Sequence, residues 1–167
     1  QWVEGNYYRK LGKERTVKNF PIPANKGNVY SADGSLLATS IPEYTIYFDA
    51  VAPTPELFKE NVQGLSDSLS VMFGKSSGHY QAKLQKARAN KSRYVFIAKK
   101  LSYTEHMRLK TFPLFNKGAN KGGLIIEQKI VREHPIGLVA KRTIGYERSN
   151  EDGKGLEYAF RDYLNGK

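Results

Sequence analysis

The stretch that decides the fold is KGNVYSADGSLLATS, residues 26–40. Val29-Tyr30 leads into a turn at Asp33-Gly34, and the apolar run Leu36-Leu37-Ala38 leads out of it. An Asp-Gly pair between two apolar runs is a strong local signal for a β-hairpin, because glycine adopts the positive φ that tight turns need. The stretch therefore predicts two antiparallel strands joined by a short turn.

Three short motifs near the C-terminus accompany this hairpin. They are Arg132-x-x-Pro135-x-Gly137, Ile144-Gly145 and Gly153-x-Gly155-x-Glu157. In this order, the hairpin and the motifs resemble the N-terminal, non-catalytic region of class B penicillin-binding proteins, which is called the pedestal or dimerisation domain. The resemblance is greatest to the cell-division transpeptidases, and it spans roughly residues 15–166.

The resemblance implies structural roles for residues in the hairpin and the later motifs. These are Lys26, Gly27, Asp33, Gly34, Arg132, Pro135, Gly137, Gly155 and Glu157. Lys26 departs from the family pattern, which has arginine there, and the last motif is one residue shorter than usual. In the family, the first and last of these positions lie in one base. We therefore expect Lys26 and Glu157 to be close in space, with Gly27 letting the backbone pass tightly.

The family's layout implies an α+β fold, in which N- and C-terminal segments form a small β-sheet base with an inserted α/β head. The expected divisions are residues 1–50 and 124–167 for the base and 51–123 for the head. No transpeptidase domain is expected within the chain.

Local patterns predict the elements of the head. Thr54-Pro55 is a typical helix start, and apolar residues then recur at spacings of three and four until Gly74. A second helix is expected over 78–89, and a third from the capping box at Ser102 to Pro113. The predicted strands are 44–48, 94–98 and 124–132, with a break at Pro42 and a flexible loop over 116–123.

The C-terminal third shows weaker helical signals. A short helical segment is expected from Pro135 to Gly145, and a final helix from Gly155 to Leu164. Asn165-Gly166 would end that helix in a left-handed cap.

The positive charge is concentrated in the middle of the chain. Residues 75–129 hold 13 basic and 2 acidic side chains, whereas the formal net charge of the whole chain is +11. Lys83, Lys86 and Arg88 share the polar side of the helix over 78–89 and are candidates for contact with an anionic surface. The alternative interpretation of these cations is a solvated face without a partner.

Catalytic and ligand-binding signatures are missing from the sequence. Penicillin-binding catalysis needs Ser-x-x-Lys, Ser-x-Asn and Lys-[Ser/Thr]-Gly, and the chain contains none of them. There are 0 cysteines, and the 3 histidines are far apart without ligand spacing. We therefore expect no catalytic residue, no cofactor and no metal.

The resemblance implies a function for the chain as part of a longer protein. The parent would be a bacterial peptidoglycan D,D-transpeptidase of septal wall synthesis, anchored by one N-terminal membrane helix on the periplasmic side of the inner membrane. The chain would be its non-catalytic pedestal. Its expected partners are the division glycosyltransferase, other divisome membrane proteins and a second copy of itself. The alternative is a free-standing basic adaptor for nucleic acid or an anionic polymer, although packing accounts for the aromatic residues among the cations.

Overall fold

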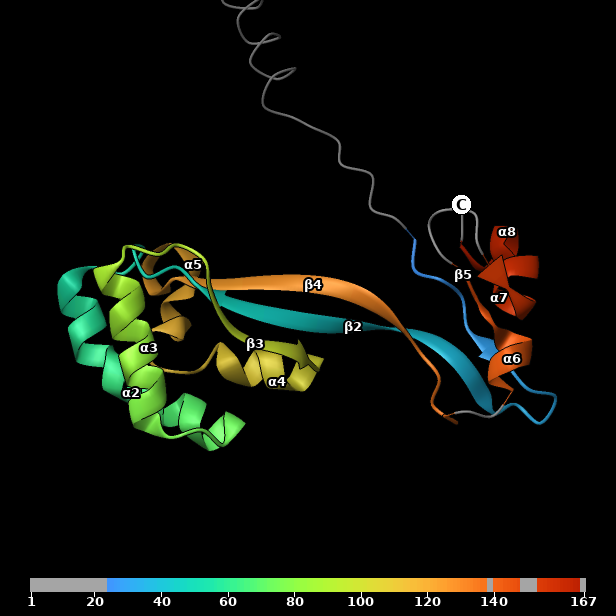
Figure 1. Cartoon of the computed structure of the whole chain (residues 1–167), viewed down its shortest axis with the longest axis horizontal. Helices are drawn as coiled ribbons and strands as arrows, with labels where there is room; N and C mark the ends of the chain where they lie inside the picture. The colour runs from blue at the N-terminus through green and yellow to red at the C-terminus, as the bar shows by residue number, and fades with distance from the viewer. Residues whose placement is uncertain (1–23, 138–139, 148–152, 166–167) are drawn as a thin grey trace, which may run out of the picture. The chain divides into compact units, whose positions relative to one another are not determined.

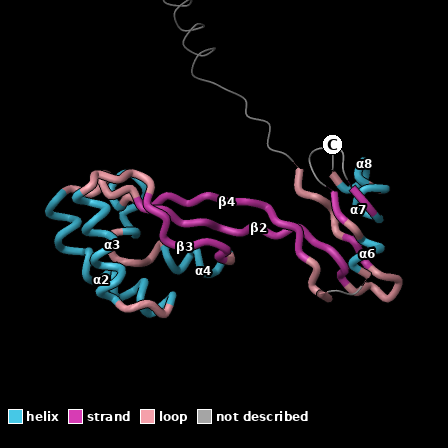
Figure 2. Tube along the Cα trace, viewed as in Figure 1, coloured by secondary structure: helices cyan, strands magenta, loops and turns pink. Residues whose placement is uncertain are grey.

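The computed structural model describes residues 24–137, 140–147 and 153–165, and it has an α+β fold (Figures 1 and 2). Contacts divide the chain into two units. The larger unit is residues 28–141, and the smaller combines residues 1–27 with 142–167. The hairpin falls in the larger unit and the final helices in the smaller, so these units differ from the expected base and head, which stay a prediction.

The larger unit is built on a four-stranded antiparallel sheet. Its strands are β1 (Val29–Tyr30), β2 (Leu36–Phe48), β3 (Val95–Leu101) and β4 (Leu124–Glu133). β4 pairs along β2 without interruption, from Thr39 opposite Glu133 to Phe48 opposite Leu124. The other side of β2 is shared by β1 and β3 (Figure 2).

The predicted hairpin is present as β1, a turn and β2. Gly34 has a φ of +83° and donates its backbone N–H to Ser31 O at 3.0 Å. The Asp33 carboxylate accepts from the backbone N–H of Ser35 at 3.1 Å. A hydrogen bond from the Ser31 hydroxyl is the main cause that lowers the pKa of Asp33. The Asp-Gly pair therefore forms the turn in the way that the sequence predicts.

The predicted break at Pro42 is wrong, because β2 runs through it as one strand of 13 residues. Pairing with β1 ends at Ala38, and pairing with β3 begins at Tyr44. Pro42 thus lies where one side of β2 has no strand beside it among the described residues. A missing N–H is tolerated at such a place because no ladder hydrogen bond is lost.

Two long helices follow β2 as predicted. α2 (Pro55–Phe73) begins at Thr54, whose side chain accepts from Leu57 N, and ends at Gly74 in the left-handed conformation. α3 (Ser77–Ala89) begins at the Ser76 cap. The buried residues of both helices join one core with β2, whose inward side chains are Tyr44, Ile46 and Phe48.

The segment between β3 and β4 is more helical than expected. The capping box of Ser102 and Glu105 starts α4 (Tyr103–Leu109), as predicted. The expected flexible loop is instead a 3₁₀ turn, η1 (Phe115–Lys117), followed by α5 (Gly118–Gly122). A Cβ on Gly122 would lie 2.0 Å from Leu114 O, so only glycine allows the backbone of α5 to approach Leu114 this closely. The prediction of a flexible loop over 116–123 is therefore wrong.

The C-terminal elements are short. They are α6 (Lys141–Ile144), β5 (Tyr146–Glu147), β6 (Gly153–Lys154), α7 (Gly155–Ala159) and α8 (Arg161–Leu164). The single final helix that we expected is divided at Phe160, which has a φ of −107° and a ψ of 21°. Asn165 is right-handed with a φ of −74°, so it does not form the expected left-handed cap, and Gly166 lies outside the described residues.

The segment after β4 also differs from the prediction. Residues 135–137 form a turn closed by a hydrogen bond from Gly137 N to His134 O at 2.9 Å, and helix begins only at Lys141. Among the described helices, none has the length and apolar character needed to cross a membrane.

Candidate functional site

The smaller unit holds a partly buried ion-pair cluster. The Lys26 ammonium lies 3.5 Å from Glu157 Oε2 and also donates to Glu147 Oε2. The Glu157 side chain is only 2% exposed, so this carboxylate is almost out of contact with water. The expectation that Lys26 and Glu157 meet, although they are 131 residues apart in sequence, is confirmed.

Glu147 was not predicted from the sequence, and Asn165 was expected only as part of a helix cap. Glu147 is in β5, where it accepts from Lys26 and also from Asn165 Nδ2, at 3.3 Å. The hydrogen bond from Lys26 is the first cause that lowers the pKa of Glu147, and partial burial opposes it. The one sequence signal near Glu147 is Gly145, two residues before it. β5 begins directly after that glycine and ends at Glu147.

Two glycines let the backbone segments around the cluster approach one another. Gly145 and Gly155 have φ angles of +70° and +73°. A Cβ on Gly145 would lie 1.8 Å from Lys154 O, and one on Gly155 would lie 2.4 Å from Thr143 O. Gly155 is the first residue of α7, the short helix that carries Glu157. These glycines therefore place the buried carboxylate.

Gly27 acts differently from our expectation. Its backbone N–H donates to Leu164 O at 2.8 Å, which ties the N-terminal segment to α8. A Cβ at this position would meet its nearest atom, Leu164 Cδ2, at 3.7 Å, an ordinary contact distance. The backbone is therefore held by a hydrogen bond at Gly27, and tight passage is not the reason for a glycine there.

The remaining motif residues belong to the larger unit. Arg132 of β4 donates from Nη1 to Ser40 Oγ, at 3.1 Å, directly across the β2–β4 ladder. Pro135 and Gly137 form the turn after β4, and Gly137 has a φ of +64°. Asp33 and Gly34 form the hairpin turn. The nine predicted motif residues thus form two groups, one within each unit.

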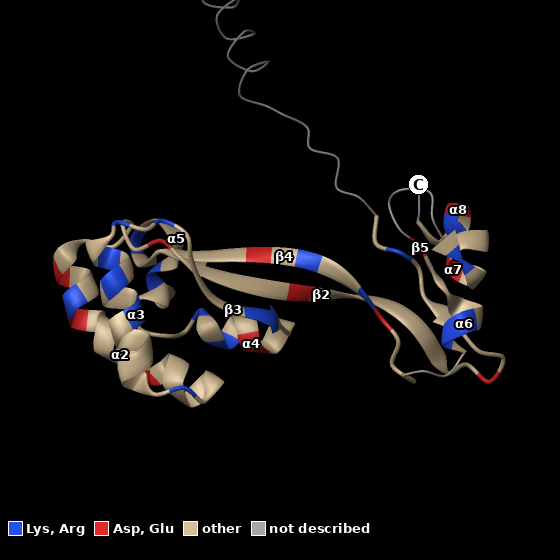
Figure 3. Ribbon diagram, in the orientation of Figure 1, with Lys and Arg blue, Asp and Glu red and all other residues tan. Residues whose placement is uncertain are grey.

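Lysine and arginine positions mark the ribbon of α3 in blue (Figure 3). The three candidate cations of this helix have different environments. Lys86 is exposed. Lys83 lies 5.6 Å from the centre of the Phe96 ring, and partial burial is the first cause that lowers its pKa, followed by Lys75. Arg88 is half-buried, and its guanidinium donates to the carbonyls of Ala50 and Pro53. Arg88 therefore fastens residues 50–53 to α3.

Aromatic rings gather on the side of the sheet that faces away from the core. Tyr47 of β2 stacks on Tyr94 with ring centres 4.0 Å apart, and Phe96 meets Tyr47 edge-on at 6.0 Å. The Tyr94 hydroxyl donates to Glu127, and this hydrogen bond is the main cause that raises the pKa of Tyr94. Tyr94 and Phe96 are 53% and 43% exposed, which is high for rings of this size.

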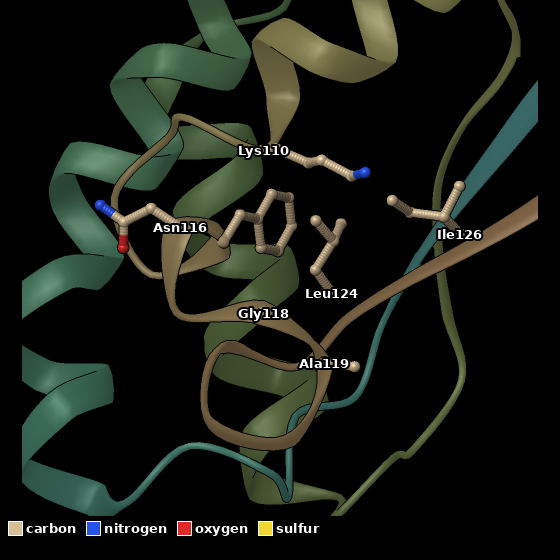
Figure 4. A pocket seen from close by; sticks show the side chains of 7 residues that line it. Lys110, Asn116, Gly118, Ala119, Leu124 and Ile126 are labelled. Carbon is tan, nitrogen blue, oxygen red and sulfur yellow. The ribbon is translucent and has the colours of Figure 1, made fainter.

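A hollow of about 410 Å³ lies between α5, β4 and the end of α4 (Figure 4). Phe115, Leu124 and Ile126 line it, and the Lys110 side chain extends over it toward Ile126. The amide of Asn116 points away from the hollow (Figure 4). One flexible cation above an apolar lining does not orient a reacting group, so the hollow has no catalytic geometry.

Within the described ranges, no group of three or more histidine, cysteine, aspartate or glutamate side chains has metal-site geometry.

Comparisons with known proteins agree with this architecture. A family model described as the penicillin-binding protein dimerisation domain matches residues 21–167. The probable peptidoglycan D,D-transpeptidase PenA of Neisseria meningitidis serogroup A is 26% identical over 171 residues. PenA of Neisseria gonorrhoeae is also 26% identical. Each alignment covers 100% of this chain and 26% of the relative, so the chain spans about a quarter of the length of these proteins.

A solved structure supports the fold independently. Penicillin-binding protein 2X from Streptococcus thermophilus is similar with a TM-score of 0.63 and 22% sequence identity. The similarity covers 87% of this chain and 23% of that one. The family match and this structural similarity agree. The chain belongs to the penicillin-binding protein dimerisation domain family, the non-catalytic region of class B penicillin-binding proteins.

Proposed function

We propose that the chain is the extracytoplasmic pedestal of a bacterial peptidoglycan D,D-transpeptidase that acts in septal wall synthesis. The observation that carries this proposal is the family match over residues 21–167, in a chain that aligns end to end with a quarter of PenA. The parent would cross-link peptidoglycan stem peptides through an acyl-serine intermediate. The chain itself holds the catalytic domain away from the membrane.

The internal construction of each unit suits a support role. The larger unit has a 13-residue strand that pairs over 10 residues with a second long strand. The smaller unit is fastened by a buried carboxylate and a lysine. Both features stabilise structure without requiring a reacting group, as expected for a spacer.

The partners of the pedestal are part of the same proposal. They are the division glycosyltransferase and other divisome membrane proteins, and the parent is anchored in the inner membrane by one N-terminal helix. The exposed rings of Tyr94 and Phe96 offer apolar area of the kind found in the centres of protein interfaces.

The proposal is tested with a fluorescent penicillin and intact-mass measurement on two proteins. The complete protein should gain the mass of one β-lactam, because its catalytic domain supplies the serine and lysine. The 167-residue chain should gain none. A stable adduct on the chain, or none on the complete protein, would contradict the assignment.

A further role for the basic surface of the larger unit is favoured by 13 basic side chains in residues 75–129. Lys83 and Lys86 are proposed to contact anionic lipid headgroups or wall polymers, whereas Arg88 is occupied by backbone carbonyls. Cosedimentation with anionic vesicles should fall when salt rises from 0.05 to 0.5 M, because the Debye length then shortens from about 14 Å to about 4 Å. Lys86→Glu should weaken it further. Binding that neither change affects would remove this role.

A further inference from the structure

The hollow between α5, β4 and the end of α4 has the size and lining of a small-molecule site (Figure 4). Its volume is about 410 Å³, and ligand pockets in proteins measure roughly 300–1,000 Å³. Phe115, Leu124 and Ile126 make its lining apolar, and the exposed Ala119 completes the lining on the side of α5. Such a lining binds an apolar group, and a polar group at the opening then determines how the ligand is oriented.

The polar group at this opening is the ammonium of Lys110. Its side chain extends from the end of α4 over the hollow toward Ile126 (Figure 4). Lys110 is exposed, and within the described ranges its ammonium forms no ion pair and no hydrogen bond. The surrounding sequence, residues 106–126, contains 4 lysines and arginines and no aspartate or glutamate. The charge at the opening therefore favours an anionic group.

The floor of the hollow is held in place by a strained turn. Leu114 has a φ of 69° and a ψ of −52°, and Phe115 N donates to Pro113 O at 2.9 Å. These features define the rarer, strained form of the γ-turn. Leu114 is fully buried, and only a glycine at position 122 allows α5 to approach its carbonyl oxygen. The surrounding structure therefore maintains the strain, and the Phe115 ring is fixed in position before a ligand binds.

We propose that this hollow is a binding site for a small amphiphilic carboxylate, a molecule with one carboxylate group and an unbranched apolar chain. The chain packs on Phe115, Leu124 and Ile126, and the carboxylate pairs with Lys110. A cation above an apolar floor is complementary to both ends of such a molecule, whereas it repels an amphiphilic cation. The site depends on the cavity and its lysine and not on the pedestal role, so either proposal can fail without the other.

Octanoate is the probe, and methyl NMR spectra of the 167-residue chain are the readout. The methyl groups of Leu124 and Ile126 should show saturable shifts, with a dissociation constant on the order of 1 mM for a ligand of this size. Butanoate has too short a chain to cover the lining, and octylamine has the opposite charge, so neither should saturate at the same concentrations. Octan-1-ol should bind about threefold more weakly than octanoate, because it has no carboxylate for Lys110.

Two variants of equal charge separate the ion pair from the general positive field. Lys110→Gln should weaken octanoate binding about threefold and leave octan-1-ol binding unchanged, because only the carboxylate pairs with the lysine. Lys117→Gln removes the same charge from the neighbouring 3₁₀ turn, outside the lining, and should change neither. Ala119→Phe fills the hollow and should abolish the binding of both ligands, and unchanged amide signals of α2 and α3 would show that the variant is folded.

Three results would overturn the proposal. They are the absence of saturable shifts with octanoate, equal effects of Lys110→Gln and Lys117→Gln on octanoate binding, and octanoate binding retained in a folded Ala119→Phe variant. Octylamine that binds as tightly as octanoate would overturn the preference for an anion. If Ala119→Phe does not fold, the comparison of the two glutamine variants decides alone.

Discussion

The carboxylate of Glu157 shows how one residue organises the smaller unit. Taking a carboxylate out of water is costly unless a cation and hydrogen bonds compensate for the lost hydration. Lys26 supplies that cation and is itself 26% exposed, while Glu147 shares it from the other side. Lys26 thus lies between the carboxylates of Glu147 and Glu157, and its removal would take the same compensating cation from both.

Replacement of Lys26 by alanine should destabilise the smaller unit. We expect a loss of about 1–3 kcal/mol, between the values for exposed and fully buried pairs, because the ammonium is partly exposed. The measurement is hydrogen exchange of backbone amides in residues 140–165. Lys154→Ala removes an exposed lysine of the same unit and is the matched control. Equal effects of the two substitutions would show that the cluster does not stabilise the unit.

Lys26→Arg tests the same cluster in the opposite direction. The guanidinium has a planar fork that can donate to Glu147 and Glu157 together, whereas an ammonium is a point charge. Exchange protection should be equal to wild type or higher. A loss as large as that of the alanine variant would mean that the space around Lys26 excludes arginine.

Among the elements, the turn into α7 depends on a glycine. Gly155→Ala should cost more than about 1 kcal/mol, because the φ is +73° and the new Cβ would lie 2.4 Å from Thr143 O. Gly78→Ala is the contrasting substitution, since Gly78 is helical with nothing within 4 Å of its Cβ direction. It should be neutral or stabilising. Amide exchange in each unit measures both effects, and equal destabilisation would contradict this account.

α4 carries a group that makes the larger unit sensitive to mild acid. His106 is buried, stacks on Tyr44 at 4.1 Å, and has its pKa lowered mainly by burial. A lowered pKa means that the unfolded chain takes up the proton first. The stability that the neutral imidazole contributes is therefore present above about pH 6.5 and is lost as the pH falls through the folded pKa.

The corresponding variant is His106→Phe, which keeps a ring against Tyr44 but has no titrating group. Urea unfolding of wild type should show a free energy that decreases from pH 7 to pH 5, and the variant should show a smaller decrease. Identical pH dependence in the two proteins would exclude His106 as the responsible group.

The sequence predicted elements well where local chemistry defines their ends. α2 begins and ends at the expected residues because Thr54, Pro55 and Gly74 act through their own backbone and side chains. β2 was missed as one strand because the tolerance of Pro42 depends on which neighbours pair beside it. α5 was missed because Gly122 is needed for a close approach to Leu114, which no local pattern encodes.

The candidate site was predictable only through the family resemblance. Composition and spacing do not relate Lys26 to Glu157, which are 131 residues apart, whereas the order of the motifs does. Glu147 belongs to no motif, and Asn165 was expected only as a helix cap. They join the cluster through the pairing of β5 with β6 and the end of α8. Arg88 had the expected position on α3, but its bonds to two carbonyls depend on the tertiary structure.

At the scale of the whole molecule, the chain is a penicillin-binding protein dimerisation domain, and its sequence contains none of Ser-x-x-Lys, Ser-x-Asn and Lys-[Ser/Thr]-Gly. The larger unit is built on the long paired strands β2 and β4, whereas the smaller unit has short elements and a buried carboxylate. We expect the parent transpeptidase to require a folded pedestal for septal synthesis but not for its reaction with β-lactams.

Cell length in bacteria that depend on the parent protein tests this claim most directly. Glu157→Lys places a second cation beside Lys26 in the buried cluster and should unfold the smaller unit. The account predicts filamentous cells, although the variant is present and reacts with fluorescent penicillin as strongly as the Lys154→Ala control. Cells of normal length with the Glu157→Lys protein, or loss of penicillin labelling at equal protein abundance, would contradict it.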